Sequence, residues 1–120
     1  MLTAIHPKLP MTDKAKTREF YVDQLGFKEL GTVDYDGYLM IGKDDIEIHF
    51  FLFKELNPLE NYGQVYIRCT DIEREYAAMK ATPAGIHPNG ALQTRPWGQR
   101  EFHMLDPDHN LLTFGQSADV

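Results

Sequence analysis

Hydrophobic residues recur along this chain with two different periods, and the two periods alternate in the same order twice. A helical spacing appears first in the segment that begins at Thr12, where the apolar face holds Thr17, Phe20, Tyr21 and Leu25 and ends at Gly26. It appears again after Thr70, where the aligned residues are Ile72, Tyr76 and Met79, before the breakers Pro83 and Gly85. Each segment opens with a Thr-Asp pair, whose side-chain oxygens can cap a helix. We therefore predict two helices.

Segments with strand character surround each predicted helix. In the first half they are 4–11 before the helix and 27–33, 38–42 and 46–53 after it. In the second half they are 63–69 before the helix and 85–88, 100–105 and 111–115 after it. Tight turns are predicted at 43–45 and 106–110, which are rich in Asp and Asn. The predicted order is βαβββ, given twice.

This order predicts an α+β fold built from two βαβββ modules, at about 1–53 and 63–120, with a linker at 54–62. A chain of 120 residues has the length of a single domain. Two twisted sheets that meet edge to edge would form one curved sheet, with the helices on its outer face. The other face would then be a concave cleft, where we expect the ligand site.

Composition and charge narrow the class of partner. Twelve basic and eighteen acidic residues give a net charge of −6, which disfavours nucleic acid because phosphate is repelled. No apolar run is long enough to span a membrane, and the first residues do not form a signal peptide, so we expect a cytoplasmic protein. The single cysteine, Cys69, excludes a disulfide within the chain and is expected to be a small buried hydrophobic residue.

Two stretches, TDKAKTREFYVDQLGF and LDPDHNLLTF, resemble the vicinal oxygen chelate superfamily. This superfamily includes glyoxalase I, extradiol dioxygenases, fosfomycin-resistance transferases and bleomycin resistance proteins. A narrower similarity to the bleomycin resistance proteins lies in Pro96-Trp97-Gly98 followed by Arg100-Glu101-Phe102, with Gln99 as an inserted residue. That resemblance implies a homodimer with two ligand clefts at its interface, and an N-terminal strand exchanged between subunits at Pro7. It also implies that the ligand is sequestered without being modified.

Strand alternation and the resemblance together predict the residues of the cleft. The predicted ligand-binding residues are Trp97, Tyr38, Phe51, His49, Glu47, Tyr66, Glu101 and His103. Flat aromatic walls suit a planar aromatic molecule, and the two carboxylates suit a cationic one. For Phe51 and Tyr66, packing in the core is an equally good interpretation. A third possibility is that the protein's own side chains fill the cleft.

Enzymes of the superfamily bind a divalent metal ion, and the four matching positions here are His6, His49, Gln64 and Thr113. Because none of these four residues is a carboxylate, we predict no metal and no cofactor. The two histidines then have ordinary structural roles, near a dimer contact and in a satisfied hydrogen bond. The alternative function is a metal-dependent lyase, thiol transferase or dioxygenase that uses His6, His49 and Gln64.

Overall fold

The computed structural model describes residues 1–118 of the chain. Contacts between Cα atoms group the chain into two compact units, Met1–Asn61 and Tyr62–Val120, so the boundary falls inside the predicted linker. Residues 119 and 120, which end the second predicted module, lie outside the described residues. That the units form one domain with one curved sheet and a concave cleft stays a prediction. In residues 1–118, no helix has the length and apolar character to cross a membrane.

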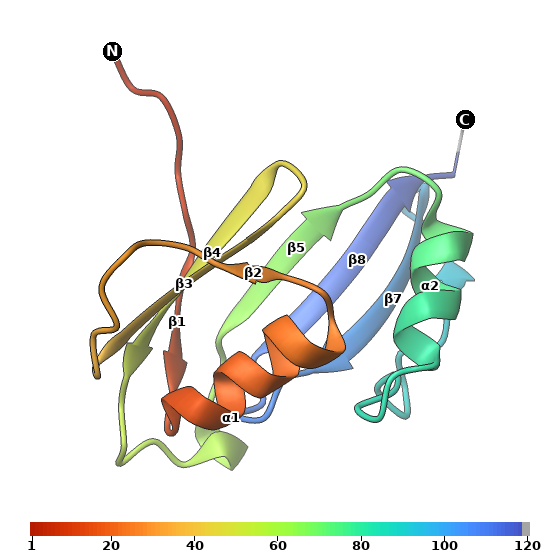
Figure 1. The fold of residues 1–120 in the computed structure, drawn as a ribbon. Helices are drawn as coiled ribbons and strands as arrows, with labels where there is room; N and C mark the ends of the chain where they lie inside the picture. Colours follow the sequence, from red (N-terminus) through yellow and green to blue (C-terminus); the bar gives the residue numbers. More distant parts are fainter. Residues whose placement is uncertain (119–120) are drawn as a thin grey trace. The chain divides into compact units, whose positions relative to one another are not determined.

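Each unit contains one four-stranded sheet, and the two sheets have the same strand order (Figure 1). The first unit comprises β1 (Lys8–Met11), α1 (Lys14–Arg18), the π-helix η1 (Glu19–Gln24), β2 (Lys28–Glu29), β3 (Tyr38–Lys43), β4 (Ile46–Leu52) and the 3-10 helix η2 (Pro58–Glu60), with sheet order β1-β4-β3-β2. The second comprises β5 (Gln64–Arg68), α2 (Ile72–Lys80), β6 (Gln93–Thr94), β7 (Gln99–Leu105) and β8 (Leu111–Ser117), with sheet order β5-β8-β7-β6. The predicted α+β fold with two βαβββ patterns is confirmed.

The first helix begins at a side-chain cap and ends at a glycine. The carboxylate of Asp13 accepts hydrogen bonds from the backbone nitrogens of Ala15 and Lys16, at 2.9 and 3.3 Å. After Arg18 the helix widens into η1, and its backbone bonds then span five residues, as from Leu25 to Phe20. Gly26, with a φ of +80°, reverses the chain, as expected for a residue that has no Cβ. The sequence pattern did not distinguish the π-helical turn from an α-helix.

Aromatic packing fixes the first helix on its sheet. The ring of Tyr21 lies 4.8 Å from that of Phe50 on β4 and 5.7 Å from that of Phe27, measured between centroids. The predicted face of the helix is buried as expected, and it covers the inward side chains of the sheet: Leu9, Met11, Leu39, Ile41, Ile48 and Phe50. These strands alternate buried and more exposed positions, which leaves one face of the sheet free of the core.

The second unit has an equivalent core, in which Phe102 and Phe114 stack at 4.8 Å with nearly parallel rings. Helix α2 is capped by Asp71, whose carboxylate accepts from the backbone nitrogen of Arg74 at 3.4 Å. Tyr76 of this helix contacts Phe102, at 5.2 Å between ring centroids. The two units therefore use the same arrangement, in which a capped helix covers one face of a sheet.

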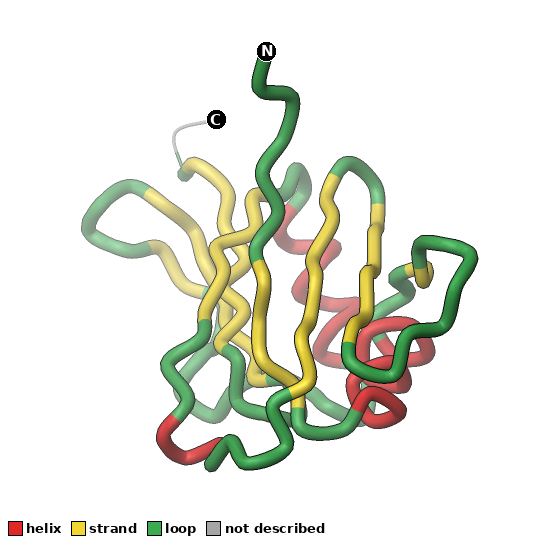
Figure 2. Tube along the Cα trace, turned by 90° about the vertical axis from the view of Figure 1, so that its left-hand side faces the viewer, coloured by secondary structure: helices red, strands yellow, loops and turns green. Residues whose placement is uncertain are grey.

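The predicted strands at 85–88, 4–11 and 27–33 need correction. Segment 85–88 is a loop, because Gly85 and Pro88 interrupt it, and the short strand of this region is β6. This loop contacts β7 through His87 and Gly90, which bond to the backbone of His103. The strands at 4–11 and 27–33 shorten to β1 and β2. Residues 1–7 form no strand and are exposed, and Figure 2 shows the N-terminal end of this segment extending away from the strands.

The turn between β7 and β8 is built around one buried carboxylate. Asp106 accepts hydrogen bonds at Oδ1 from the backbone nitrogens of Asp108 and Asn110, both at 2.9 Å. At Oδ2 it accepts from the side-chain amide of Asn110, at 2.8 Å. All three residues are buried. The loss of this carboxylate would leave several buried donors without an acceptor.

We therefore predict that Asp106→Ala lowers the free energy of unfolding by about 3 kcal/mol, measured by urea denaturation. The matched control is Asp45→Ala in the turn between β3 and β4, where the aspartate is exposed. That variant should stay within about 0.5 kcal/mol of the parent. Equal losses in the two variants would show that the buried bonds of the Asp106 turn contribute nothing specific.

Candidate functional site

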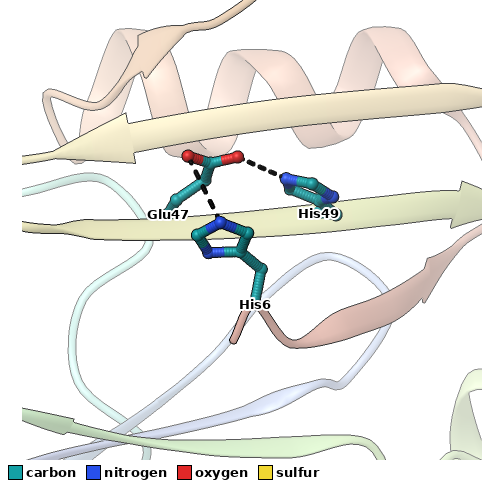
Figure 3. A group of neighbouring side chains, drawn as sticks. All are labelled: His6, Glu47 and His49. Atoms are coloured by element: carbon teal, nitrogen blue, oxygen red, sulfur yellow. Dashed lines mark hydrogen bonds and ion pairs between the residues drawn. The ribbon is translucent and has the colours of Figure 1, made fainter. Parts of the chain in front are cut away.

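A cluster of two imidazoles and one carboxylate lies at the outward face of β4, with His6 coming from the segment before β1 (Figure 3). Glu47 and His49 are two residues apart on the strand and therefore project from the same face. His49 Nε2 lies 2.5 Å from Glu47 Oε2, and His6 Nε2 lies 3.7 Å from Glu47 Oε1. The two imidazole rings stack at 5.1 Å between centroids. The hydrogen bond to His49 is the main cause that lowers the pKa of the Glu47 carboxyl, so this carboxyl is ionised.

Tyr38 on the neighbouring strand completes the surroundings of His49. Its hydroxyl lies 2.7 Å from Nδ1 of His49, so both ring nitrogens of this histidine have partners. In a neutral ring whose Nε2 donates to Glu47, Nδ1 would be the acceptor for the hydroxyl. The amine of Lys8 lies 5.4 Å from the centre of the Tyr38 ring. Phe51 is 38% exposed, so the structure does not support its packing in the core.

The second unit carries its own polar cluster, centred on the carboxylate of Glu101. This residue is only 3% exposed, although it lies on the face of β7 opposite Phe102. Its Oε2 accepts hydrogen bonds from the hydroxyl of Tyr66 at 2.7 Å and from the indole nitrogen of Trp97 at 3.2 Å. The predicted residues Glu101, Tyr66 and Trp97 are therefore brought together around one acceptor.

The two aromatic rings that bind Glu101 remain open to solvent. Trp97 is 64% exposed and Tyr66 is 46% exposed, so each ring is anchored at its polar atom and uncovered over much of its surface. Burial of the hydroxyl and the bond to Glu101 raise the pKa of Tyr66 to about 12. The phenol therefore stays protonated and donates a hydrogen bond to Glu101. Gly115 on β8 leaves room for the Tyr66 ring in this position, because a Cβ at residue 115 would lie 2.0 Å from the Tyr66 hydroxyl oxygen.

Arg95 is a member of this cluster that the sequence did not predict. Its guanidinium lies 5.8 Å from the centre of the Trp97 ring, and its Nε lies 3.8 Å from Glu101 Oε1. That Nε is buried and makes no hydrogen bond to any residue that the structure describes. The only sequence signal was the position of Arg95, two residues before Trp97. Gln99, the inserted residue, begins β7 and accepts a hydrogen bond from Arg68 at 2.8 Å.

His103 contacts this cluster through Arg95. Its Nδ1 lies 2.9 Å from the hydroxyl of Thr113, and its Nε2 lies 3.4 Å from a guanidinium nitrogen of Arg95. Burial and the nearby Arg95 charge lower the pKa of His103, which favours the neutral ring at neutral pH. Thr113 is buried, whereas Gln64 on β5 is exposed. Of the four matched metal positions, the described first unit therefore brings together His6 and His49, and it adds Glu47.

Comparison with known proteins agrees with the motifs found in the sequence. The family model described as the Glyoxalase/Bleomycin resistance protein/Dioxygenase superfamily matches residues 3–114. Bleomycin resistance proteins of Geobacillus stearothermophilus and Staphylococcus aureus are each 31% identical to this chain, over 97% of it and 97% of their own length.

Solved structures give the same result. A bleomycin-binding protein complexed with bleomycin matches with a TM-score of 0.84 and 26% identity, over 97% of this chain and 99% of that one. A bleomycin resistance determinant encoded on the transposon Tn5 matches with a TM-score of 0.83 and 26% identity, over 97% and 98%. The bleomycin-binding protein from bleomycin-producing Streptomyces verticillus, complexed with copper(II)-bleomycin, shares the fold, with a TM-score of 0.75, 21% identity and coverage of 95% and 97%.

The resemblance found in the sequence is thus confirmed at three levels: the family model, the related sequences and the fold. The family model covers nearly the whole chain, and relatives at 31% identity cover 97% of it. This chain therefore belongs to the glyoxalase/bleomycin resistance protein/dioxygenase superfamily.

Proposed function

We propose that this protein sequesters a planar, cationic aromatic molecule of the bleomycin type, without chemistry, in clefts at a homodimer interface in the cytoplasm. The similarity to bleomycin resistance proteins over nearly the whole chain supports the ligand class. The similarity to a bleomycin-binding protein complexed with bleomycin supports binding as the mode of action. The proposed ligand-binding residues are the eight predicted from the sequence.

The single observation that carries this proposal is the exposed indole ring of Trp97, anchored by its nitrogen on the buried carboxylate of Glu101. Because Trp97 is 64% exposed, burial of its ring contributes little to the stability of the folded chain. Because the anchor fixes its orientation before a ligand arrives, little side-chain entropy is lost on binding. Each stacking contact with a flat ligand contributes roughly 0.5–1.5 kcal/mol beyond area burial.

Electrostatics favour a cation and restrict how it stacks. Glu101 and Glu47 place carboxylates among the proposed aromatic residues, and the chain as a whole carries −6. Arg95, however, lies over the ring of Trp97. A cationic ligand would be repelled on that side, so we propose that it stacks on the face of the indole that is turned away from Arg95.

The N-terminal arm, residues 1–7, supports the proposed dimer. Met1, Leu2 and Ile5 are almost fully exposed, which is unfavourable for apolar side chains in an isolated chain. A second copy of the chain would cover them if the arm is exchanged at Pro7. The dimer and the exchange are both proposals, and the oligomeric state of the purified protein tests the dimer.

A metal-dependent enzyme of the same fold is the second candidate function. The observation that favours it is the group of His6, Glu47 and His49 on the first unit. Against it, Thr113 bonds to His103, and Gln64 is a weak neutral ligand. Turnover of a small substrate in the presence of zinc or manganese would support the enzyme, whereas saturable binding without turnover supports sequestration.

We predict that Trp97→Ala weakens bleomycin binding by about 2 kcal/mol, or about thirtyfold in Kd, because stacking and apolar burial are both lost. Isothermal titration calorimetry on metal-free protein measures the change. The control is Tyr62→Ala, which removes another exposed aromatic ring outside the proposed site and should leave Kd unchanged. A Trp97→Ala variant that binds as tightly as the parent would remove the central contact of the proposal.

We also predict that Gly115→Ala weakens bleomycin binding about three- to tenfold, because the new methyl group displaces the Tyr66 ring from Glu101. The same titration measures this loss. Gly37→Ala is the matched control, since a Cβ at Gly37 meets nothing within 4 Å. Unchanged affinity in a folded Gly115→Ala variant would mean that Tyr66 does not contact the ligand.

A further inference from the structure

The exposed aromatic rings of Trp97 and Tyr66 each have an arginine over one face. The guanidinium of Arg95 lies 5.8 Å from the centre of the Trp97 ring, and that of Arg68 lies 5.3 Å from the centre of the Tyr66 ring. The negative potential above an aromatic ring attracts such a cation. A ligand that stacks on the free face of either ring therefore has an arginine beside it.

The hydrogen-bond donors of the two rings are already used inside the protein. The hydroxyl of Tyr66 and the indole nitrogen of Trp97 both donate to Glu101, at 2.7 and 3.2 Å, and each group has a single proton to donate. Arg68 is exposed to water and donates to the side-chain oxygen of Gln99 at 2.8 Å. A ligand that approaches these rings therefore finds no free donor on Trp97 or Tyr66.

Arg95 differs, because its donors have poor partners. Its Nε is buried and makes no hydrogen bond within the described part of the chain, since Oε1 of Glu101 stands 3.8 Å away. Another nitrogen of the guanidinium lies 3.4 Å from Nε2 of His103, which is longer than the roughly 3.0 Å of a good hydrogen bond. The side chain is still 26% exposed. An acceptor brought by a ligand would replace bonds to water that this guanidinium has lost.

We propose that Arg95 determines which planar ligands the ring of Trp97 accepts. Arg95 repels a cationic group from its own side of the ring. Its guanidinium donates hydrogen bonds to an oxygen acceptor, such as a carboxamide or a carboxylate, that the ligand carries at the edge of its planar ring. The inference rests on the proposed function, because it takes Trp97 as the stacking residue. It adds that the ligand carries its positive charge away from Arg95 and an acceptor beside it.

The charges around Trp97 support this orientation. The carboxylate of Glu101 is only 3% exposed, and its oxygens face the donors of Tyr66 and Trp97 and the guanidinium of Arg95. This negative charge is therefore largely compensated inside the protein, whereas part of the Arg95 side chain reaches the surface. Although the chain as a whole carries −6, an arginine is the charge nearest to a ligand on this side of the indole ring.

The test uses two planar cations that have the same ring and the same charge: N-methylquinolinium and its derivative with a carboxamide on the ring. Quenching of the fluorescence of Trp97, the single tryptophan of the sequence, measures the binding of each. We expect the parent chain to bind the carboxamide derivative about tenfold more tightly, because it gains a hydrogen bond to a charged donor. Bleomycin is titrated in the same assay.

Two variants of Arg95 separate its two effects. In Arg95→Met, the carboxamide derivative loses its donor and the unsubstituted cation is no longer repelled, so we expect the preference to disappear and the unsubstituted cation to bind about two- to threefold more tightly. In Arg95→Lys, the repulsion remains but the planar fork of donors is lost. The unsubstituted cation should then bind as in the parent, with a smaller preference for the carboxamide.

The matched control is Arg100→Met, which removes the same charge from the opposite face of β7. There Arg100 pairs with Glu73 at 2.7 Å. This variant should keep the preference of the parent. Because the preference compares two probes on one protein, a general loss of stability in a variant would not imitate the expected change.

The inference and the proposed function fail in different ways. If the parent binds bleomycin but shows no preference for the carboxamide derivative, or does not bind it, the inference is wrong and the proposed function stands. A preference that survives in Arg95→Met would also overturn the inference. If the parent binds neither bleomycin nor either probe, the proposed function fails and the inference fails with it.

Discussion

A carboxylate in the interior of a protein must be met by donors, and Glu101 imposes this constraint on the second unit. The Tyr66 hydroxyl and the Trp97 indole nitrogen satisfy it, and both rings are thereby fixed at their polar atoms while their faces stay in water. Gly115 leaves the space that the Tyr66 ring occupies. If the carboxylate lost these donors, the cost of burying it would destabilise the sheet. Fold stability and presentation of the aromatic rings therefore rest on the same hydrogen bonds.

The two units share one topology but carry two different kinds of polar side-chain cluster. Both sheets have the same strand order, and both use the inward face for an apolar core beneath a capped helix. In the first unit, His49 and Glu47 on the outward face of β4 lie beside the imidazole of His6, which precedes β1. In the second unit, Tyr66 on β5 and Trp97 in the loop before β7 place aromatic rings around the buried acid Glu101. A superfamily that contains both binding proteins and enzymes is consistent with this separation, since the core constrains only every second strand residue.

Local rules predicted much of this structure, and long-range contacts decided the rest. Helical spacing identified the buried face that contains Tyr21, and alternation placed Glu47 and His49 on one face of β4. The burial of Glu101 was not predictable, because it depends on Tyr66 from a distant strand and on a loop that returns Trp97 to it. The π-helical turn and the position of β6 were not predicted, because neither of them changes the hydrophobic period of the sequence. The role of Arg95 depends on the same loop.

The stoichiometry of drug capture is the most direct test of sequestration without chemistry. The protein would be incubated with excess bleomycin for increasing times, and the free drug would be separated by ultrafiltration. The bound drug would then be released by denaturation, and its amount and mass would be measured by mass spectrometry. We expect the amount of captured drug to equal the number of binding sites and not to increase with time, and we expect the drug to keep its original mass. Drug consumed in excess of the protein, or recovered with an altered mass, would contradict sequestration and identify the protein as an enzyme.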